Sequence, residues 1–353
     1  IWAVADGFIT PLGAANLLEF KSGPPARWRF LVSAGDGRAV EIELCAEMPH
    51  GKNITVLTLH RPDKLPTKGK LLLPGKVFSL TVRVDIEDRS FHAETHLDEA
   101  YEYFFCENIS HNEKGFCFSP ERGRQLKVEV SRGMFHYEME WSREVPHPIE
   151  ANRGQSPFGD ACSPGWFEIA LAPNSEAVLT VESATETLAV EDPQPVSWKD
   201  EGDVFCCRLQ NALQQFIVKR GKGQTVIAGY PWFLDWGRDT FIATRGLLAA
   251  GWGDVVRGIV HTFARLERDG TLPNTLHGGD DSNRETSDAP LWFGLVCEEL
   301  AGEKGESVYT ETVGDGRSLL DVLGSWLHFL MFFRVAEELS LIHISEPTRR
   351  TPI

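Results

Sequence analysis

The sequence of 353 residues has no apolar run near the ~20 residues that a membrane-spanning helix needs, so we expect no transmembrane segment. It is also poor in cations: 35 Lys and Arg stand against 51 Asp and Glu, which gives a net charge of −16. A surface of this sign repels phosphate backbones and anionic lipids. We therefore expect neither a nucleic acid nor a membrane as a partner, whereas a neutral carbohydrate would meet no such repulsion.

Cysteine is scarce too. The seven cysteines are odd in number and irregularly spaced, and no CxxC pair or Cys/His cluster has the spacing of a zinc site. We therefore expect reduced thiols, no metal and no cofactor. The sequence shows no secretory signal, which makes the cytoplasm the expected compartment. Because the chain begins at Ile1 rather than at Met, we expect a fragment of a longer protein.

The first 185 residues follow the two-residue period of β-strands. In the clearest example, apolar residues from Phe78 to Ile86 alternate with polar ones. The same alternation marks strands at 40–46, 126–130, 135–141, 166–171 and 177–181. Turn residues at 131–133 and 172–175 predict that the last four of these strands form two hairpins. Many short antiparallel strands with one polar face predict a β-sandwich domain over residues 1–185.

A stretch rich in Glu and Pro, residues 186–201, predicts a linker, because neither a strand nor a helix continues through Asp192-Pro-Gln-Pro195. Beyond it the apolar period becomes helical. Helices are predicted at 205–217, 239–250, 254–268, 288–301 and 319–338. We therefore expect an all-α domain over residues 202–338. The last residues, 339–353, do not fit this pattern, and we expect a non-native or disordered tail.

The segment 228–240, AGYPWFLDWGRDT, is the densest in side chains that carry chemistry. It interleaves aromatic rings with charged groups: Tyr230, Trp232, Trp236, Asp235, Arg238 and Asp239. Aromatic faces pack on the C–H faces of a sugar, and carboxylate and guanidinium groups each bind two neighbouring hydroxyls. The segment therefore predicts a saccharide site. The alternative is an aromatic edge of the core with a surface ion pair between Asp235 and Arg238.

A second segment, 270–293, reads GTLPNTLHGGDDSNRETSDAPLWF. It is too polar and too rich in glycine for a core, and it leads into the helix predicted from Asp288. Its Asp280 and Asp281 lack the spacing and the terminal Glu of an EF-hand calcium loop. The segment therefore predicts a solvated loop in front of a helix.

Together the motifs GYPWFLDWGRDT, LPNTLHGG and SDAPLWF, in this order and spacing, closely resemble the amylo-α-1,6-glucosidase domain of bacterial and archaeal glycogen debranching enzymes. The resemblance covers about residues 195–300. The β-rich half is similar to the sandwich domain that precedes the catalytic domain in that family. The resemblance implies an (α/α)6 six-hairpin barrel similar to that of glucoamylases. The implied activity is hydrolysis, with inversion, of α-1,6-linked glucose at branch points of glycogen or limit dextrin.

The resemblance also implies roles for single residues. The Asp of SDAPLWF, Asp288, matches the general acid. The WGRD motif assigns Arg238 and Asp239 to the hydroxyls of the non-reducing glucose, with Trp236 as the stacking wall. Weaker candidates for the same pocket, whose alternative role is to support the loop, are Tyr230, Trp232 and Asn274.

Two features near Asp288 have opposite effects on the pKa of its carboxyl group. The helix dipole favours the carboxylate form. Apolar cover from Pro290 and Trp292 would favour the protonated acid, which is the form that acid catalysis requires.

The chain departs from the family toward its C-terminal end. An (α/α)6 barrel has twelve helices, and there is room for about five after the linker. We find no match for the later Glu that serves as general base in this family, so we expect the fragment to be inactive alone. Two alternatives stay open: a non-catalytic carbohydrate-binding protein, and another inverting α-glucosidase such as a glucoamylase or a trehalase. The sequence does not give the oligomeric state, the branch-length preference or any transferase activity of a longer protein.

Overall fold

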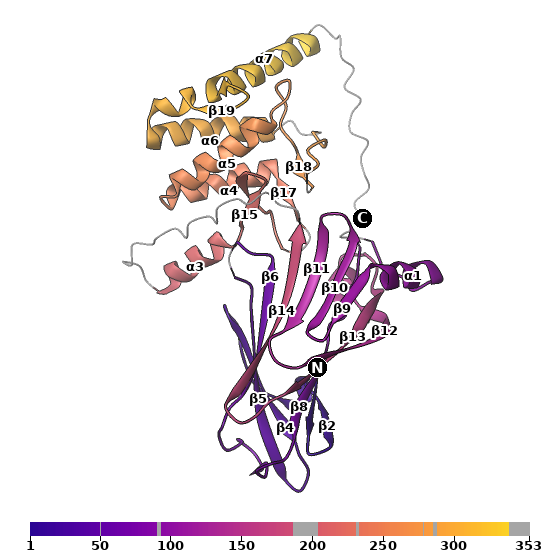
Figure 1. Ribbon diagram of the computed structural model, residues 1–353. Coiled ribbons are helices and arrows are strands. Elements are labelled where there is room, and N and C mark those ends of the chain that lie inside the picture. The colour runs from indigo at the N-terminus through magenta and orange to yellow at the C-terminus, as the bar shows by residue number, and fades with distance from the viewer. Residues whose placement is uncertain are drawn as a thin grey trace. The chain divides into compact units, whose positions relative to one another are not determined.

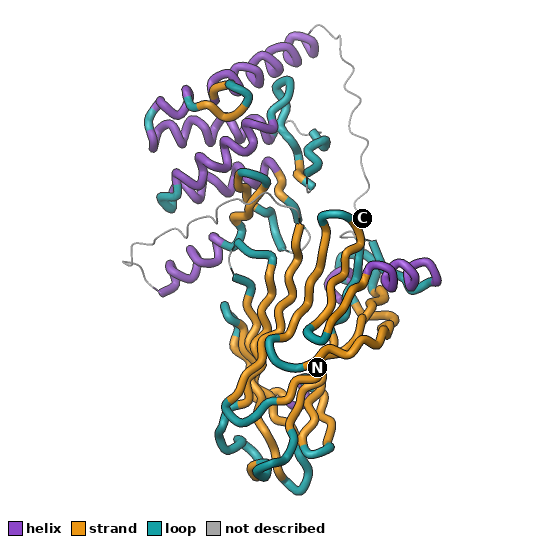
Figure 2. Tube along the Cα trace, viewed as in Figure 1, coloured by secondary structure: helices purple, strands orange, loops and turns teal. Residues whose placement is uncertain are grey.

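The computed structural model describes residues 1–49, 51–89, 93–185, 204–230, 233–277, 279–284 and 288–338, without the side chains of residues 184, 185, 204 and 329–338. The chain divides into two compact units, Ile1–Thr187 (unit 1) and Leu188–Ile353 (unit 2). Figure 1 labels their elements, and Figure 2 colours them by secondary structure. The predicted linker, 186–201, and the predicted tail, 339–353, lie outside the described residues.

Unit 1 contains two mainly antiparallel sheets. The five-stranded sheet has the order β12-β13-β8-β1-β2. Its strands are β1 (Trp2–Ala5), β2 (Phe8–Pro11), β8 (Phe78–Arg83), β12 (Met134–Pro146) and β13 (Phe158–Ala170). The nine-stranded sheet has the order β3-β4-β5-β6-β14-β11-β10-β9, and β7 pairs with β5 in parallel. Its strands are β3 (Leu17–Lys21), β4 (Ala26–Ser33), β5 (Arg38–Glu47), β6 (Ile54–Arg61), β7 (Lys70–Leu71), β9 (Ile109–Asn112), β10 (Gly115–Glu121), β11 (Arg124–Val130) and β14 (Ser175–Thr185). The helices of this unit are η1 (Ala14–Asn16), α1 (Glu99–Asn108) and α2 (Pro148–Ala151).

The core of unit 1 takes apolar side chains from both sheets, which is the arrangement of a β-sandwich. Leu80 and Phe167 come from the five-stranded sheet. Ile42, Leu59 and Leu179 come from the nine-stranded sheet. All five are at most 1% exposed. In the strands that the sequence predicted, the apolar face points into this core, as the two-residue period indicated.

The two predicted hairpins are wrong. β11 and β12, which the turn at 131–133 joins, lie in different sheets, and so do β13 and β14. β12 pairs instead with β13, and β14 lies between β6 and β11. The first turn carries Gly133 at φ +129°, where a Cβ would lie 2.5 Å from the Glu168 carbonyl oxygen, so only glycine lets the chain cross between the sheets there. Alternation shows which side of a strand is buried, but not which strand it pairs with.

Unit 2 contains helices at the five predicted places. They are α3 (Val204–Gln214), α4 (Gly237–Ala249), α5 (Gly253–Leu266), α6 (Ala289–Lys304) and α7 (Leu319–Glu338). Between them lie short elements that the pattern did not predict: η2 (Glu306–Thr310) and the strand pairs β15 (Ile217–Arg220) with β16 (Gly223–Val226), β17 (Asp235–Trp236) with β18 (Thr275–Leu276), and β19 (Thr312–Gly314) with β20 (Arg317–Ser318). The (α/α)6 barrel stays a prediction, since such a barrel has twelve helices.

Helices α4, α5 and α6 pack around a cluster of phenylalanines. The ring centroid of Phe241 in α4 lies 4.8 Å from that of Phe263 in α5 and 5.4 Å from that of Phe293 in α6, with the rings edge to face. All three side chains are at most 1% exposed. α5 also buries Val256 and Ile259, as its three- to four-residue apolar spacing predicted. This shared core fixes α4 and α6 relative to each other.

Two expectations from composition concern the cysteines and the hydropathy of the helices. All seven cysteines carry free thiols. Among the helices that the structure describes, none combines the length and the hydropathy needed to cross a bilayer.

One buried carboxylate in unit 1 fastens the loop after β6 to the sheet. Glu41 of β5 has a side chain that is only 1% exposed. The Thr67 amide donates to it at 2.6 Å and Arg29 at 3.1 Å, and the Thr67 hydroxyl and Lys64 contact it as well. Burial acts to raise the pKa of Glu41, but the hydrogen bonds from Thr67, Arg29 and Lys64 outweigh burial and lower the pKa to about 2.

We predict that Glu41→Gln lowers the free energy of unfolding of unit 1 by about 3 kcal/mol at pH 7, which is the equivalent of the lowered pKa. Because the folded-state pKa lies below the unfolded-state value of 4.5, this stabilisation is present above that pH and is lost as the pH falls toward 2. Urea unfolding at pH 7 and at pH 3 measures the difference between wild type and variant, which should shrink at pH 3. Glu47→Gln, an exposed change on the same strand, is the control. A difference that is the same at both pH values would contradict this role of Glu41.

Candidate active site

Two motifs that are far apart in the sequence are joined by backbone hydrogen bonds in unit 2. Trp236, the first residue of WGRD, and Asp235 before it form β17, which pairs with β18: Asp235 lies opposite Leu276 and Trp236 opposite Thr275. The contact continues one residue further, because the Gly237 amide donates to the loop carbonyl of residue 274 at 2.9 Å. The chain then enters α4. The aromatic segment and the polar loop therefore meet at the start of this helix.

The start of α4 approaches the start of α6 so closely that position 237 has no room for a side chain. A Cβ on Gly237 would lie 2.6 Å from the Pro273 carbonyl oxygen and 3.2 Å from the Cβ of Ala289, the first residue of α6. Glycine is required here by close approach of other atoms. As a consequence, the residues just after Gly237 and just before Ala289 are neighbours.

Three of the predicted site residues form one charged cluster at this junction. Arg238, on the first turn of α4, has Nη2 3.5 Å from an Asp239 oxygen and Nη1 3.7 Å from an Asp288 oxygen. The side chains of Arg238, Asp239 and Asp288 are 51%, 43% and 42% exposed. Ion pairs this exposed contribute ~0–1 kcal/mol, so hydroxyls of a ligand can replace them with little loss. The cluster therefore offers a ligand two carboxylates and one guanidinium.

Asp288 takes the N-cap position of α6, and its carbonyl accepts a hydrogen bond from the Trp292 amide at 3.0 Å. Its carboxylate makes no capping hydrogen bond to the helix and lies against Arg238. The apolar cover predicted for this carboxylate is incomplete. Pro290 is buried in the first turn, and the Trp292 ring has the Arg245 guanidinium over it at 5.8 Å. The Asp288 carboxylate is thus accessible to a ligand.

The alternative ion pair between Asp235 and Arg238 is wrong, because Asp235 pairs with Arg220. The Asp235 side chain is 1% exposed. Arg220, at the end of β15, donates from Nε to one carboxylate oxygen at 2.8 Å and from Nη2 to the other. A buried carboxylate needs such a partner, but the sequence spacing does not reveal which arginine supplies it. The pair anchors β17 to the β15–β16 hairpin and leaves Arg238 to Asp239 and Asp288.

The structure fastens Tyr230 to the chain just after α3. Its hydroxyl donates to the Gln215 carbonyl at 2.9 Å, and its ring centroid lies 5.8 Å from that of Phe216. Burial, and then the nearby Asp235 carboxylate, raise the pKa of Tyr230. The residue is 56% exposed, and its contact with a sugar stays a prediction. Trp232 lies outside the described residues.

Trp236 and Asn274 both lie at the β17–β18 junction. Trp236 is half-buried directly before Gly237, and it lies opposite Thr275 across the strand pair. Asn274 is half-buried as well, and its backbone amide donates to the Asn283 carbonyl at 2.7 Å. Both residues therefore help to hold the two motifs together, and their contact with a sugar stays a prediction.

Acidic residues of the polar loop bind groups of the protein itself. Asp281 contacts Arg268 at 2.8 Å and Arg284 at 3.3 Å. Arg284 also donates to the carbonyls of Leu266 and Thr271, so this network fixes the loop onto the end of α5. Within the part of the chain that the structure describes, no group of three His, Cys, Asp or Glu side chains could hold a metal ion.

We predict that Asp235→Asn destabilises unit 2 by about 2–3 kcal/mol, because it removes the charge that compensates the partly buried Arg220 guanidinium. Asp239→Asn is the matched control, since its exposed ion pair should change the stability by less than about 1 kcal/mol. Urea unfolding followed by tryptophan fluorescence measures both variants. Equal effects of the two substitutions would rule out the anchoring role assigned to Asp235.

Solved structures resemble the chain only weakly. A heparan sulfate lyase from Pedobacter heparinus is 11% identical over 60% of this chain and 26% of its own, with a TM-score of 0.28. A heparinase III structure is 9% identical over 48% of this chain and 21% of its own, with a TM-score of 0.24. The chain thus spans about a quarter of the length of these structures.

Two family models match the chain directly. One, described as amylo-alpha-1,6-glucosidase, matches residues 211–306, a range that contains Arg238, Asp239 and Asp288. The other, described as the glycogen debranching enzyme N terminal, matches residues 2–178. This second match alone spans half of the sequence. The chain therefore belongs to the glycogen debranching enzyme family.

Proposed function

We propose that this chain carries the general acid and the terminal-glucose site of an inverting glycoside hydrolase. Its proposed reaction removes α-1,6-linked glucose at branch points of glycogen or limit dextrin, so a branched α-glucan is the proposed substrate. The observation that supports this most is the exposed cluster of Arg238, Asp239 and Asp288, in which two separate motifs meet. The amylo-alpha-1,6-glucosidase model matches the residues that form the cluster.

The proposed glucose site uses the guanidinium and the carboxylate of WGRD. Arg238 donates from its planar fork to two neighbouring hydroxyls, and Asp239 accepts hydrogen bonds from hydroxyls. Trp236 offers an indole face to the C–H face of the ring. Because the ion pair between Arg238 and Asp239 is exposed, both groups can turn to the sugar with little loss of free energy.

Asp288 is the proposed general acid. Its carboxyl donates a proton to the glycosidic oxygen as the bond to the glucan breaks, while water attacks the anomeric carbon from the opposite face. Apolar surroundings favour the protonated form of a carboxyl group, and a bound sugar ring would supply the cover that the free site lacks. The attacking water needs a second carboxylate ~6.5–9.5 Å from the acid. We assign this base to no described residue, and we propose that the chain alone binds sugar without hydrolysing it.

In an enzyme that carries this chain and hydrolyses limit dextrin, Asp288→Asn should lower the rate of glucose release by ~10²–10⁴-fold, because the proton donor is lost and the shape of the side chain is kept. Asp254→Asn is the matched control, since Asp254 is an exposed aspartate in the first turn of α5. Retention of more than about a tenth of the wild-type rate would remove Asp288 from the role of general acid.

Arg238→Ala should weaken the binding of acarbose, a glucose-like inhibitor, by about 10- to 100-fold, since hydrogen bonds to charged groups contribute ~1.5–3 kcal/mol each. Asp288→Asn should weaken it less, because Asn can still bind a hydroxyl. Calorimetric titration measures both, with Arg245→Ala as the control from the same helix, where Arg245 pairs with Glu299. Wild-type affinity in Arg238→Ala would mean that WGRD has a structural role only.

A further inference from the structure

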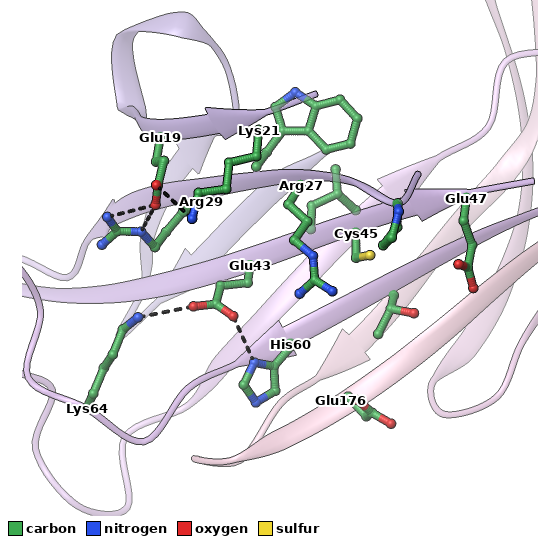
Figure 3. Close-up of a pocket in the computed structure, with 14 residues that line it drawn as sticks. Glu19, Lys21, Arg27, Arg29, Glu43, Cys45, Glu47, His60, Lys64 and Glu176 are labelled. Atoms are coloured by element: carbon green, nitrogen blue, oxygen red, sulfur yellow. Dashed lines mark hydrogen bonds and ion pairs between the residues drawn. The ribbon is translucent and has the colours of Figure 1, made fainter. Parts of the chain in front are cut away.

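A cavity of about 780 Å³ opens on the face of the nine-stranded sheet that points away from the core of unit 1 (Figure 3). Its volume falls within the ~300–1,000 Å³ of typical ligand sites. The side chains that line it come from β3, β4, β5, β6 and β14 and from the loop after β6. Most of the residues that line it carry charged or polar side chains.

One row of cavity residues runs straight across the strands. Its members are direct cross-strand partners: Glu19, Arg29, Glu43, His60 and Glu176. Arg29 contacts Glu19 at 3.3 Å, and His60 contacts Glu43 at 3.4 Å. Opposite charges on neighbouring strands stabilise a sheet, so most of this row is compensated within the protein. Glu176, at its end, is the exception.

In the next row of the cavity, the charges are not balanced by opposite charges on the neighbouring strands. Lys21 lies opposite Arg27, and Arg27 lies opposite Cys45. Two cations directly opposite each other are unfavourable. Lys21 has an acceptor in Glu19 at 3.2 Å. The Arg27 side chain is exposed and forms no ion pair or hydrogen bond with any residue that the structure describes, and in Figure 3 it extends over the sheet toward His60.

Two carboxylates at the cavity also lack a partner. Glu47 lies two residues beyond Cys45 on β5, diagonal to Arg27, a position at which Cα atoms are ~7–8 Å apart. Glu176 lies on β14. Neither side chain forms an ion pair or a hydrogen bond within the described ranges of the chain. The cavity therefore presents one guanidinium and two carboxylates whose hydrogen-bonding capacity the protein does not use.

Because the cavity carries both positive and negative groups, only some classes of ligand would bind there favourably. An anion would be attracted by Arg27 but repelled by Glu47 and Glu176, and a cation would meet the reverse. An apolar ligand would bury all three charges without partners. A neutral polyhydroxyl compound suits all of them, because its hydroxyls donate to carboxylates and accept from a guanidinium. Pro25 also lines the cavity and offers an apolar face of the kind that packs on sugar rings, whereas the Trp28 side chain packs against the core on the other face of β4.

We propose that this cavity is a second sugar site, which binds a linear segment of an α-glucan chain. The preference for a neutral polyhydroxyl ligand rests on the cavity alone, whereas its identification as α-glucan rests on the proposed function. Because both sites belong to the same chain, binding of one polymer to both becomes intramolecular, which raises the effective concentration of its branch points for the cluster of Arg238, Asp239 and Asp288.

The test is calorimetric titration of the full chain with maltoheptaose, a linear α-glucan probe. All variants carry Arg238→Ala, so the cluster in unit 2 makes little contribution. In this background Arg27→Ala should lower the affinity about tenfold or more, the effect of losing charged hydrogen bonds. Arg122→Ala should leave the affinity unchanged, because Arg122 is an exposed arginine between β10 and β11 of the same sheet, outside the cavity.

Glu47→Gln keeps the shape of the side chain and should weaken the binding of maltoheptaose by a smaller factor than Arg27→Ala does. If Arg27→Ala does not fold, Glu47→Gln takes its place in the test. Unchanged affinity in the folded variants, or no binding of maltoheptaose in the Arg238→Ala background, would overturn the proposal. Displacement of maltoheptaose by inorganic phosphate would also overturn it, because the cavity would then be an anion site. Acarbose binding to the wild-type chain is measured separately, so a failure of the proposed function is distinguishable from a failure of this proposal.

Discussion

The close approach of two helix starts is the constraint on which the candidate active site depends. At position 237 a single methyl group would lie 2.6 Å from the Pro273 carbonyl oxygen, so α4 can begin here only with glycine. The buried pair of Arg220 and Asp235 fixes the strand that leads into this position. Arg238 then follows within the first turn of α4 and reaches Asp288, which directly precedes α6. Backbone contact at Gly237 and the buried ion pair thus bring the exposed side chains of Arg238 and Asp288 together.

Much of the fold could be predicted from the sequence, because local geometry imposes a period on each element. The strands β5, β8, β11, β12, β13 and β14 of unit 1 and the five helices of unit 2 follow from periods of two and of three to four residues, whereas the other strands of unit 1 were not predicted. Strand partners could not be predicted, since alternation defines faces and not neighbours. That is why β11 and β12 were expected in one hairpin although they lie in different sheets. The two-residue strands β17 and β18 are too short to show any period, yet they join the two motifs.

The residues of the candidate site also fall into those that the sequence singles out and those that it does not. The motifs single out Arg238, Asp239 and Asp288, and the structure places these three side chains in one cluster, while their contact with a sugar stays a prediction. Arg220 could not be predicted, since a buried carboxylate requires a cation but many arginines would satisfy that rule. The cavity of unit 1 was missed for a related reason. Its uncompensated Arg27 is apparent only once the strand register places it opposite Lys21.

We infer that the WGRD motif and the start of α6 act as one sugar site, and a double-mutant cycle on acarbose binding measures whether this claim holds. Affinities are measured by calorimetry for the wild-type chain, Arg238→Ala, Asp288→Asn and the double variant. If both side chains contact the same sugar and each other, their effects should deviate from additivity by at least ~0.5 kcal/mol. Additive effects of the two substitutions, or no effect of either, would contradict the claim.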